Sequence, residues 1–150
     1  MPSHYDGTEQ ERLALTAYIT LMRCAESVTR RLSPLLAASG LTETQFGVLE
    51  ALYHLGSMNQ SQLGAKTLKS SGNMTLVVDN LEKRRLARRE RSTVDRRVVV
   101  VHLTPEGRSL VAGLMPAHAA NVVAEFDLLT TEEQEDLRRL CKKVGIGVPS

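Results

Sequence analysis

Residues 57–103 read SMNQSQLGAKTLKSSGNMTLVVDNLEKRRLARRERSTVDRRVVVVHL, and this stretch decides the fold. Asn59 and Gln62 have the spacing of a capping box, in which two side chains satisfy free N–H groups at the start of a helix. We therefore expect a short helix, a tight turn over residues 69–72, and a second helix to about Arg84. The second helix carries an apolar stripe at helical spacing that consists of Met74, Val77, Val78 and Leu81. Two short helices joined by a tight turn are typical of a helix-turn-helix.

Two strand-like segments follow this helix pair. Residues 87–91 are short and basic, and residues 98–103 contain four consecutive valines, whose β-branched side chains favour strands. The polar segment 92–97 between them has the composition of a hairpin tip. A helix pair followed by a hairpin predicts a winged helix-turn-helix lobe over residues 42–103, in which the hairpin is the wing.

Helices are also expected before this stretch. Residues 9–38 repeat apolar side chains at three- and four-residue steps, namely Leu13, Ala17, Leu21, Ala25, Val28 and Leu32. Pro34 should kink or interrupt this helix near its end. A Thr42-x-x-Gln45 capping box opens the next helix, which should end near Gly56.

The C-terminal part is expected to be helical as well. Thr104-Pro105-Glu106 combines a capping threonine, a first-position proline and an acidic residue near the positive helix end. That helix should reach about Leu129 with a bend at Pro116. Thr130-x-x-Glu133 should cap a last helix to about Val144.

The predicted fold is mainly α with a small β-hairpin wing, in the order α-α-α-α-β-β-α-α. We interpret residues 1–150 as a single domain, since the length suits one domain of ordinary size. The terminal helices, 9–38 and 105–146, must bury their apolar faces somewhere. In a chain of this size a symmetric second copy is the economical solution, so the sequence predicts a homodimer joined through them.

Composition excludes several classes of protein. Hydrophobic residues make up 42% and charged residues 24%, as in a soluble globular protein. No apolar run approaches the ~20 residues of a membrane span, and the polar start is not a signal peptide. Cys24 and Cys141 form no C-x-x-C pair, which indicates a cytoplasmic protein with reduced thiols. Both cysteines are expected to be small buried hydrophobic residues.

Motifs for catalysis are missing from the sequence. It contains no G-x-S-x-G, no P-loop and no G-x-G-x-x-G. The histidines His4, His54, His102 and His118 have no metal-ligand spacing with one another or with the cysteines. We therefore expect neither an enzyme, nor a cofactor, nor a metal site.

Positive charge is concentrated in one window. Residues 83–97 contain eight basic and two acidic residues, so this window carries +6, whereas the net charge of the whole chain is +2. Such a cluster indicates a polyanion partner, and double-stranded DNA suits a helix-turn-helix. The alternative interpretation is a solvated charged face.

The N-terminal turn of a recognition helix reaches base edges in the major groove. The candidates for base contacts are Ser70, Ser71, Gly72, Asn73, Thr75 and Leu76. The serines and Asn73 could instead act only as helix caps. Leu76 has no hydrogen-bonding group, so it could contact a thymine methyl group or only pack.

The remaining candidates divide between phosphates and the minor groove. The first helix of the pair and the end of the second should contact the DNA backbone through Gln60, Ser61, Gln62, Lys66, Arg84 and Arg85. The wing candidates are Arg91, Asp95, Arg96 and Arg97, because a wing arginine fits the narrow minor groove of A·T-rich DNA. Asp95 is expected to hold an arginine and the wing in place.

Four segments closely resemble the MarR family of bacterial regulators: Leu68–Thr75, Val78–Arg84, Asp95-Arg96-Arg97-Val98 and Leu103-Thr104-Pro105-Glu106-Gly107. The resemblance implies an obligate homodimer that binds a pseudo-palindromic operator. It also implies that Asp95 and Arg97 are the family's wing pair, with Arg97 as the leading minor-groove candidate. Two residues depart from the family pattern. Arg85 stands where many relatives have Gly, which would cost about 1 kcal/mol in a left-handed conformation, and Leu76 stands at an often polar position.

The resemblance further implies control by a small molecule. In many such regulators an aromatic or phenolic anion enters a pocket between the dimerisation helices and the lobe, and DNA is released. The residues expected near that junction are Tyr18, Arg23, Tyr53 and His54, for which ordinary packing is the alternative. The sequence thus predicts a homodimeric repressor with an effector. The alternative function is a non-specific architectural or partner-binding module without effector control.

Overall fold

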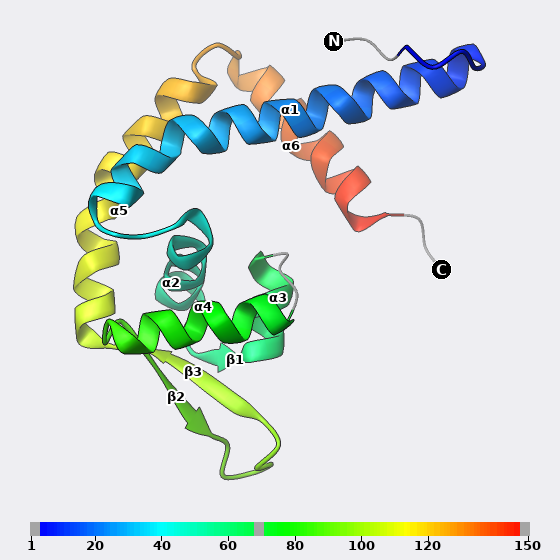
Figure 1. Ribbon diagram of the computed structural model, residues 1–150. Helices are drawn as coiled ribbons and strands as arrows, with labels where there is room; N and C mark the ends of the chain where they lie inside the picture. The colour runs from blue at the N-terminus through cyan, green and yellow to red at the C-terminus, as the bar shows by residue number, and fades with distance from the viewer. Residues whose placement is uncertain (1–3, 68–70, 148–150) are drawn as a thin grey trace.

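The computed structural model describes residues 4–67 and 71–147 of the chain. Its elements are α1 (Glu9–Ala38), α2 (Glu43–Leu55), β1 (Met58–Asn59), α3 (Gln60–Thr67), α4 (Ser71–Lys83), β2 (Ala87–Arg91), β3 (Val99–Leu103), α5 (Pro105–Phe126) and α6 (Thr131–Ile146). Figure 1 shows that α2, α3, α4 and the strands form one lobe. Helices α1 and α6 lie on one side of this lobe, and the β2–β3 hairpin projects on the other.

The predicted fold class and element order are confirmed, with three differences. Helix α1 runs through Pro34 without interruption. Pro34 has no N–H to donate to the Arg30 carbonyl, and that carbonyl instead accepts a hydrogen bond from Ser33 Oγ at 2.9 Å. Helix α5 ends at Phe126, three residues earlier than expected. The third difference is strand β1, whose two residues are too few to show an alternating pattern in the sequence.

Threonines set the starts of four helices. Thr8, Thr42 and Thr130 each take part in a capping box in which the third residue of the helix returns a hydrogen bond. Thr104 caps α5, and Pro105 is its first residue. These pairings satisfy N–H groups that a helix leaves free, so they fix where the helices begin.

The strands form a three-stranded antiparallel sheet in the order β1-β3-β2. Ala87 pairs with Leu103 and Arg91 with Val99, while the short strand β1 pairs Met58 with Val101 on the other edge of β3. Val101, in the central strand, is fully buried. Strand β1 thereby ties the start of α3 to the base of the wing.

The core lies inside the lobe and at its junction with α1 and α5. Its fully buried side chains come from every helix of the lobe and from β3: Val48, Leu49, Leu52, Leu63, Met74, Val78, Leu81 and Val101. Leu36 of α1 and Val111 and Leu114 of α5 join this cluster. The lobe therefore has a core of its own, into which only one end of α1 and the first half of α5 are packed.

The terminal helices (α1, α5 and α6) differ in how much they bury within one chain: α5 has three buried residues, α1 has one and α6 has none. In α6 no side chain is buried, and Leu140 and Val144 are largely exposed. Cys24 and Cys141 are exposed too. The prediction that both cysteines are buried is therefore wrong for the single chain, because neither the middle of α1 nor α6 contributes a buried residue. No helix within the described ranges is long and apolar enough to cross a membrane.

An ion pair joins two of these helices. The guanidinium of Arg31 in α1 lies 2.7 Å from a carboxylate oxygen of Glu125 in α5. Hydrogen bonding to Arg31 holds the pKa of Glu125 below its ordinary value. Because Glu125 stays ionised, the pair links α1 to the far half of α5 under neutral conditions.

Candidate nucleic-acid interface

Helix α4 has one face in the core and the opposite face toward solvent. Met74, Val78 and Leu81 are fully buried, so the 3.6-residue period turns Asn73 and Leu76 outward. Leu76 is 61% exposed. This face is available for contact with a partner, as predicted for a recognition helix.

The other base-contact candidates lie at the start of the same helix. Ser71 and Gly72 form its first turn, and Ser70 lies outside the described residues. Thr75 is tied to α3, since Gln60 Nε2 donates a hydrogen bond to Thr75 Oγ1 at 2.7 Å. The two helices of the pair are thus joined directly by two of the predicted site residues.

Arg89 of β2 connects the wing to both helices. Its Nη1 donates to Asp79 Oδ1 and Glu82 Oε1 of α4 at 2.6 Å each. Its Nη2 donates to the carbonyl of Thr75 at 2.8 Å, and its Nε to Gln60 Oε1 at 3.3 Å. The side chain is only 21% exposed. Arg89 therefore holds α4 against the wing.

Sequence reasoning counted Arg89 only as part of the basic window. A partial signal was present, because Asp79 and Glu82 lie three residues apart and share one side of a helix. Nothing in the sequence alone pairs that side with a particular strand arginine. The structure supplies the pairing and removes Arg89 from the charges available to a polyanion.

The wing pair has the geometry that was predicted for it. Arg97 Nε and its backbone N–H donate to Asp95 Oδ1 at 3.1 and 3.0 Å. This hydrogen bonding to Arg97 holds the pKa of Asp95 below its ordinary value. The Arg97 side chain is nevertheless 91% exposed. Arg91 braces the same turn, since its Nη1 donates to the Arg96 carbonyl at 2.6 Å.

The wing returns to the start of α3. Arg97 and Val98 line a shallow depression of about 270 Å³ together with Asn59, Gln60 and Ser61. The structure thus brings a predicted minor-groove residue next to two predicted phosphate-contacting residues.

Two further candidates for phosphate contacts, Gln62 and Lys66, lie in different surroundings. Gln62 Oε1 accepts a hydrogen bond from the Asn59 backbone, as the capping box requires. Lys66 is exposed on the wall of a separate cavity described below. Their contacts to DNA stay predictions.

Arg84 and Arg85 directly follow α4. Arg84 donates to the carbonyls of Gly40 at 2.7 Å and Ser39 at 2.9 Å, so it joins the end of α4 to the end of α1. Arg85 has φ of 59°, the left-handed conformation that glycine adopts without cost. Its carbonyl accepts a hydrogen bond from Thr104 at 2.7 Å. The strain predicted at Arg85 is thus present.

A polar chain runs across the base of the wing. Ser57 Oγ lies 2.7 Å from His102 Nδ1, and His102 Nε2 lies 3.0 Å from Glu90 Oε2. Glu90 also pairs with Arg88. The contact with Arg88, and then that with His102, hold the pKa of Glu90 below its ordinary value. These contacts connect Ser57, which precedes β1, to β3 and β2 on the face of the sheet opposite to Val101.

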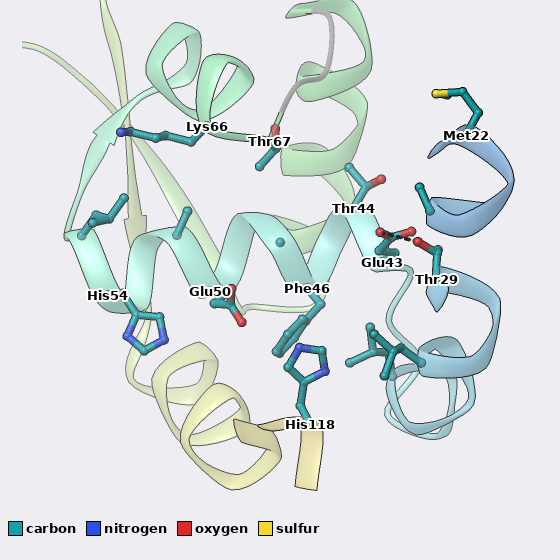
Figure 2. A pocket seen from close by; sticks show the side chains of 16 residues that line it. Met22, Thr29, Glu43, Thr44, Phe46, Glu50, His54, Lys66, Thr67 and His118 are labelled. Carbon is teal, nitrogen blue, oxygen red and sulfur yellow. Dashed lines mark hydrogen bonds between the residues drawn. The ribbon is translucent and has the colours of Figure 1, made fainter. Parts of the chain in front are cut away.

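A cavity of about 900 Å³ separates α1 from the lobe. Figure 2 shows it between Met22 and Thr29 of α1 on one side and residues of α2 on the other, with Phe46 and His118 at one end. Thr29 Oγ1 donates to Glu43 Oε1 at 3.4 Å across it. The cavity therefore lies between the terminal helices and the lobe.

His118 is the notable residue of this cavity. Its ring meets Phe46 edge to face, with centroids 4.9 Å apart. Its Nδ1 is buried, and among the described residues it is the one buried side-chain nitrogen or oxygen without a hydrogen-bond partner. A buried polar atom without a partner is costly, so His118 Nδ1 is the polar atom of this cavity wall whose hydrogen-bonding capacity is unused within the described chain.

A family model and a relative found by sequence both indicate the same protein family. A family model described as the MarR family matches residues 41–99. The HTH-type transcriptional regulator MhqR of Bacillus subtilis is 37% identical over 134 residues, which span 89% of this chain and 92% of MhqR. The chain belongs to the MarR family of transcriptional regulators.

Solved structures of similar proteins match this chain over most of its length. AbsC, a MarR-family regulator from Streptomyces coelicolor, matches with a TM-score of 0.82 and 27% identity over 95% of this chain and 96% of AbsC. BpsR of Bordetella bronchiseptica, whose DNA binding is regulated by 6-hydroxynicotinic acid, matches with a TM-score of 0.79 and 27% identity over 86% of this chain and 98% of BpsR. The likeness therefore extends beyond the lobe to the terminal helices.

In this MarR-family chain the predicted effector residues do not converge. His54 lines the cavity, whereas Tyr18, Arg23 and Tyr53 are not among its lining residues. Tyr18 is 61% exposed on α1, and Tyr53 lies beneath Arg108, 5.4 Å from the guanidinium carbon. Sequence reasoning did not bring Phe46 and His118 together at this cavity, since they lie on helices distant in sequence and carry no motif. No group of three or more metal-ligating side chains occurs within the described ranges.

Proposed function

We propose that this MarR-family regulator is a cytoplasmic homodimeric repressor that binds a pseudo-palindromic operator and releases it when a small effector binds. The observation that carries the DNA-binding part is Arg97. It is almost fully exposed, is fixed by Asp95, and lies beside Gln60 and Ser61 at the start of α3. A fixed, exposed arginine on a wing suits a narrow minor groove, while α4 occupies the adjacent major groove.

The terminal helices support the dimer. Apolar side chains that are exposed in one chain gather on them: Leu13, Tyr18, Leu21, Met22, Val123, Leu140, Val144 and Ile146. Monomeric proteins rarely leave so many large apolar residues on one set of elements. A two-fold symmetric partner would cover them and place two copies of α4 on successive turns of one duplex face.

The cavity supports the effector. It is lined by α1 on one side and α2 on the other, so a ligand there would alter how the lobe sits against the terminal helices. BpsR, a relative with the same fold, is regulated by a hydroxylated aromatic acid. The buried Nδ1 of His118 would bind a hydroxyl or carboxyl group of such a compound.

DNA binding is tested with the full-length chain. Duplexes selected from a random library should bind with dissociation constants of roughly nanomolar size, and the affinity should fall steeply as salt rises. Equal affinity for all duplexes would instead support the non-specific architectural or partner-binding module.

The role of the wing is tested by a matched pair of variants, Arg97→Gln and Arg96→Gln. Both remove one charge from the hairpin tip, but only Arg97 is fixed by Asp95. Arg97→Gln should lose about tenfold in affinity, and more on A·T-rich than on G·C-rich flanks. Equal losses in the two variants would show that the wing contributes charge alone.

The effector is tested by release of a bound duplex with a panel that contains 6-hydroxynicotinic acid and neutral phenols. His118→Leu should abolish the response to an active compound while DNA affinity stays unchanged. Tyr18→Phe, outside the cavity, is the control and should respond like the unchanged protein. A response that survives His118→Leu would place the effector elsewhere.

A further inference from the structure

Leu76 is a large apolar residue on a surface where the chain leaves few of them. Across the lobe (residues 42–103, apart from the undescribed 68–70), the exposed large hydrophobic residues are Leu55, Leu76 and Val94. Leu55 lines the cavity and Val94 sits at the tip of the wing. Only Leu76 stands on the outward face of α4, so packing within the chain does not account for it.

The neighbours of Leu76 define what it can contact. Helical spacing places Asn73 and Asn80 three and four residues away on the same face, with Lys83 one turn further. An isolated apolar side chain between two amides and a cation is too small a patch for docking another protein. The basic window that begins at Lys83 favours a polyanion instead.

Only one base offers an apolar group to a helix in the major groove. Thymine presents its C5-methyl group there, while its partner adenine presents the acceptor–donor pair that an Asn amide matches. A leucine between two asparagines is therefore complementary to A·T pairs. It is a poor match to G·C pairs, whose major-groove edges carry hydrogen-bonding groups and no methyl.

We propose that Leu76 is a specificity-determining residue that reads a thymine methyl group in each operator half-site. The inference rests on the proposed function, since it requires α4 to lie in the major groove. The thymine lies opposite the middle of α4, next to base pairs within reach of Asn73 and Asn80. Leu76 thereby replaces a hydrogen-bonded contact with an apolar one.

The test removes the methyl group without touching the protein. A duplex selected by the full-length chain is remade with deoxyuridine in place of thymine, one position at a time and in both half-sites. At one position the unchanged protein should lose about fourfold in affinity per half-site, the effect of withdrawing one buried methyl group. Leu76→Ala should bind the thymine duplex correspondingly less well and show no further loss with deoxyuridine.

Val94→Ala is the matched control. It also removes an exposed apolar side chain, but the minor groove near the wing presents no thymine methyl, so its loss with deoxyuridine should equal that of the unchanged protein. The proposal is overturned if no deoxyuridine position weakens binding, or if Leu76→Ala keeps the full loss. If the unchanged protein selects no duplex at all, both the proposed function and this inference fail. That outcome appears in the selection step, before any deoxyuridine duplex is made.

Discussion

The lobe and the terminal helices solve the same physical problem in opposite ways. In the lobe, each of α2, α3 and α4 has fully buried side chains, and Val101 of β3 lies among them. In α6 no residue is buried, and in α1 the buried residue is Leu36, next to the lobe. Both regions have apolar residues at helical spacing. Within the described residues of one chain, the lobe covers its apolar residues, whereas α6 and most of α1 leave theirs exposed.

The difference shows what an apolar pattern in a sequence does not predict. An apolar stripe predicts that a helix has a buried face, but it does not say what covers that face. For α4 the cover is α2, α3 and the sheet. For α6 the described residues of one chain leave every side chain at least partly exposed. We therefore predict that the lobe is stabilised by its own core and that the terminal helices are stabilised by a second copy of the chain.

The largest effect should follow a charge on the terminal helices. Leu140→Glu puts a carboxylate on the apolar face of α6, where Leu140 is 50% exposed in one chain. In a symmetric dimer the change counts twice, so the dissociation constant should rise by about a thousandfold or more. Sedimentation at micromolar concentration should then give the mass of one chain.

Leu76→Glu is the control for mass, because it charges an exposed leucine of the lobe. It should sediment like the unchanged protein while losing DNA affinity. If Leu140→Glu also keeps the mass of a dimer, the exposed face of α6 is not part of the interface. The contrast between the two regions would then need another explanation.

The next effect tests the core of the lobe. Leu49 is fully buried in α2, and Leu49→Ala should lower the free energy of unfolding by about 2–5 kcal/mol, because it removes apolar contact and leaves a cavity. Urea denaturation at several protein concentrations measures this loss. The loss should be the same at each concentration, unlike that of Leu140→Glu.

Arg89 should give a smaller effect that separates position from charge. Arg89→Ala leaves Asp79 and Glu82 side by side without their cation, and should cost about 1–3 kcal/mol of stability. DNA affinity should fall as well, since α4 loses its link to the wing. Arg88→Ala is the control, because Arg88 is more than half exposed and pairs with Glu90 at the surface. If the two variants lose the same amount of stability and of DNA affinity, Arg89 contributes only its positive charge.

These variants also mark which parts of the site the sequence could predict. Local chemistry sufficed for the cap at Thr104 and, with the family resemblance, for the pairing of Asp95 with Arg97, because the partners lie within three residues of one another. Arg89 and His118 act through contacts with elements far away in the chain. Periodicity and capping carry no information about such contacts, so the wing pair was predictable while the link between wing and helix was not.

The smallest effect concerns Arg85, where the lobe joins α5. Its left-handed conformation costs a non-glycine residue about 1 kcal/mol, so Arg85→Gly should stabilise the protein by roughly that amount in thermal or urea unfolding. The side chain is exposed, and a phosphate contact would be a reason for the chain to bear the strain. In that case Arg85→Gly should weaken binding to all duplexes alike and make it less sensitive to salt. Arg85→Asn separates the two effects, because asparagine tolerates the left-handed conformation better than arginine but carries no charge. If Arg85→Gly is more stable and binds DNA as tightly as the unchanged protein, the strain at Arg85 has no role in DNA binding.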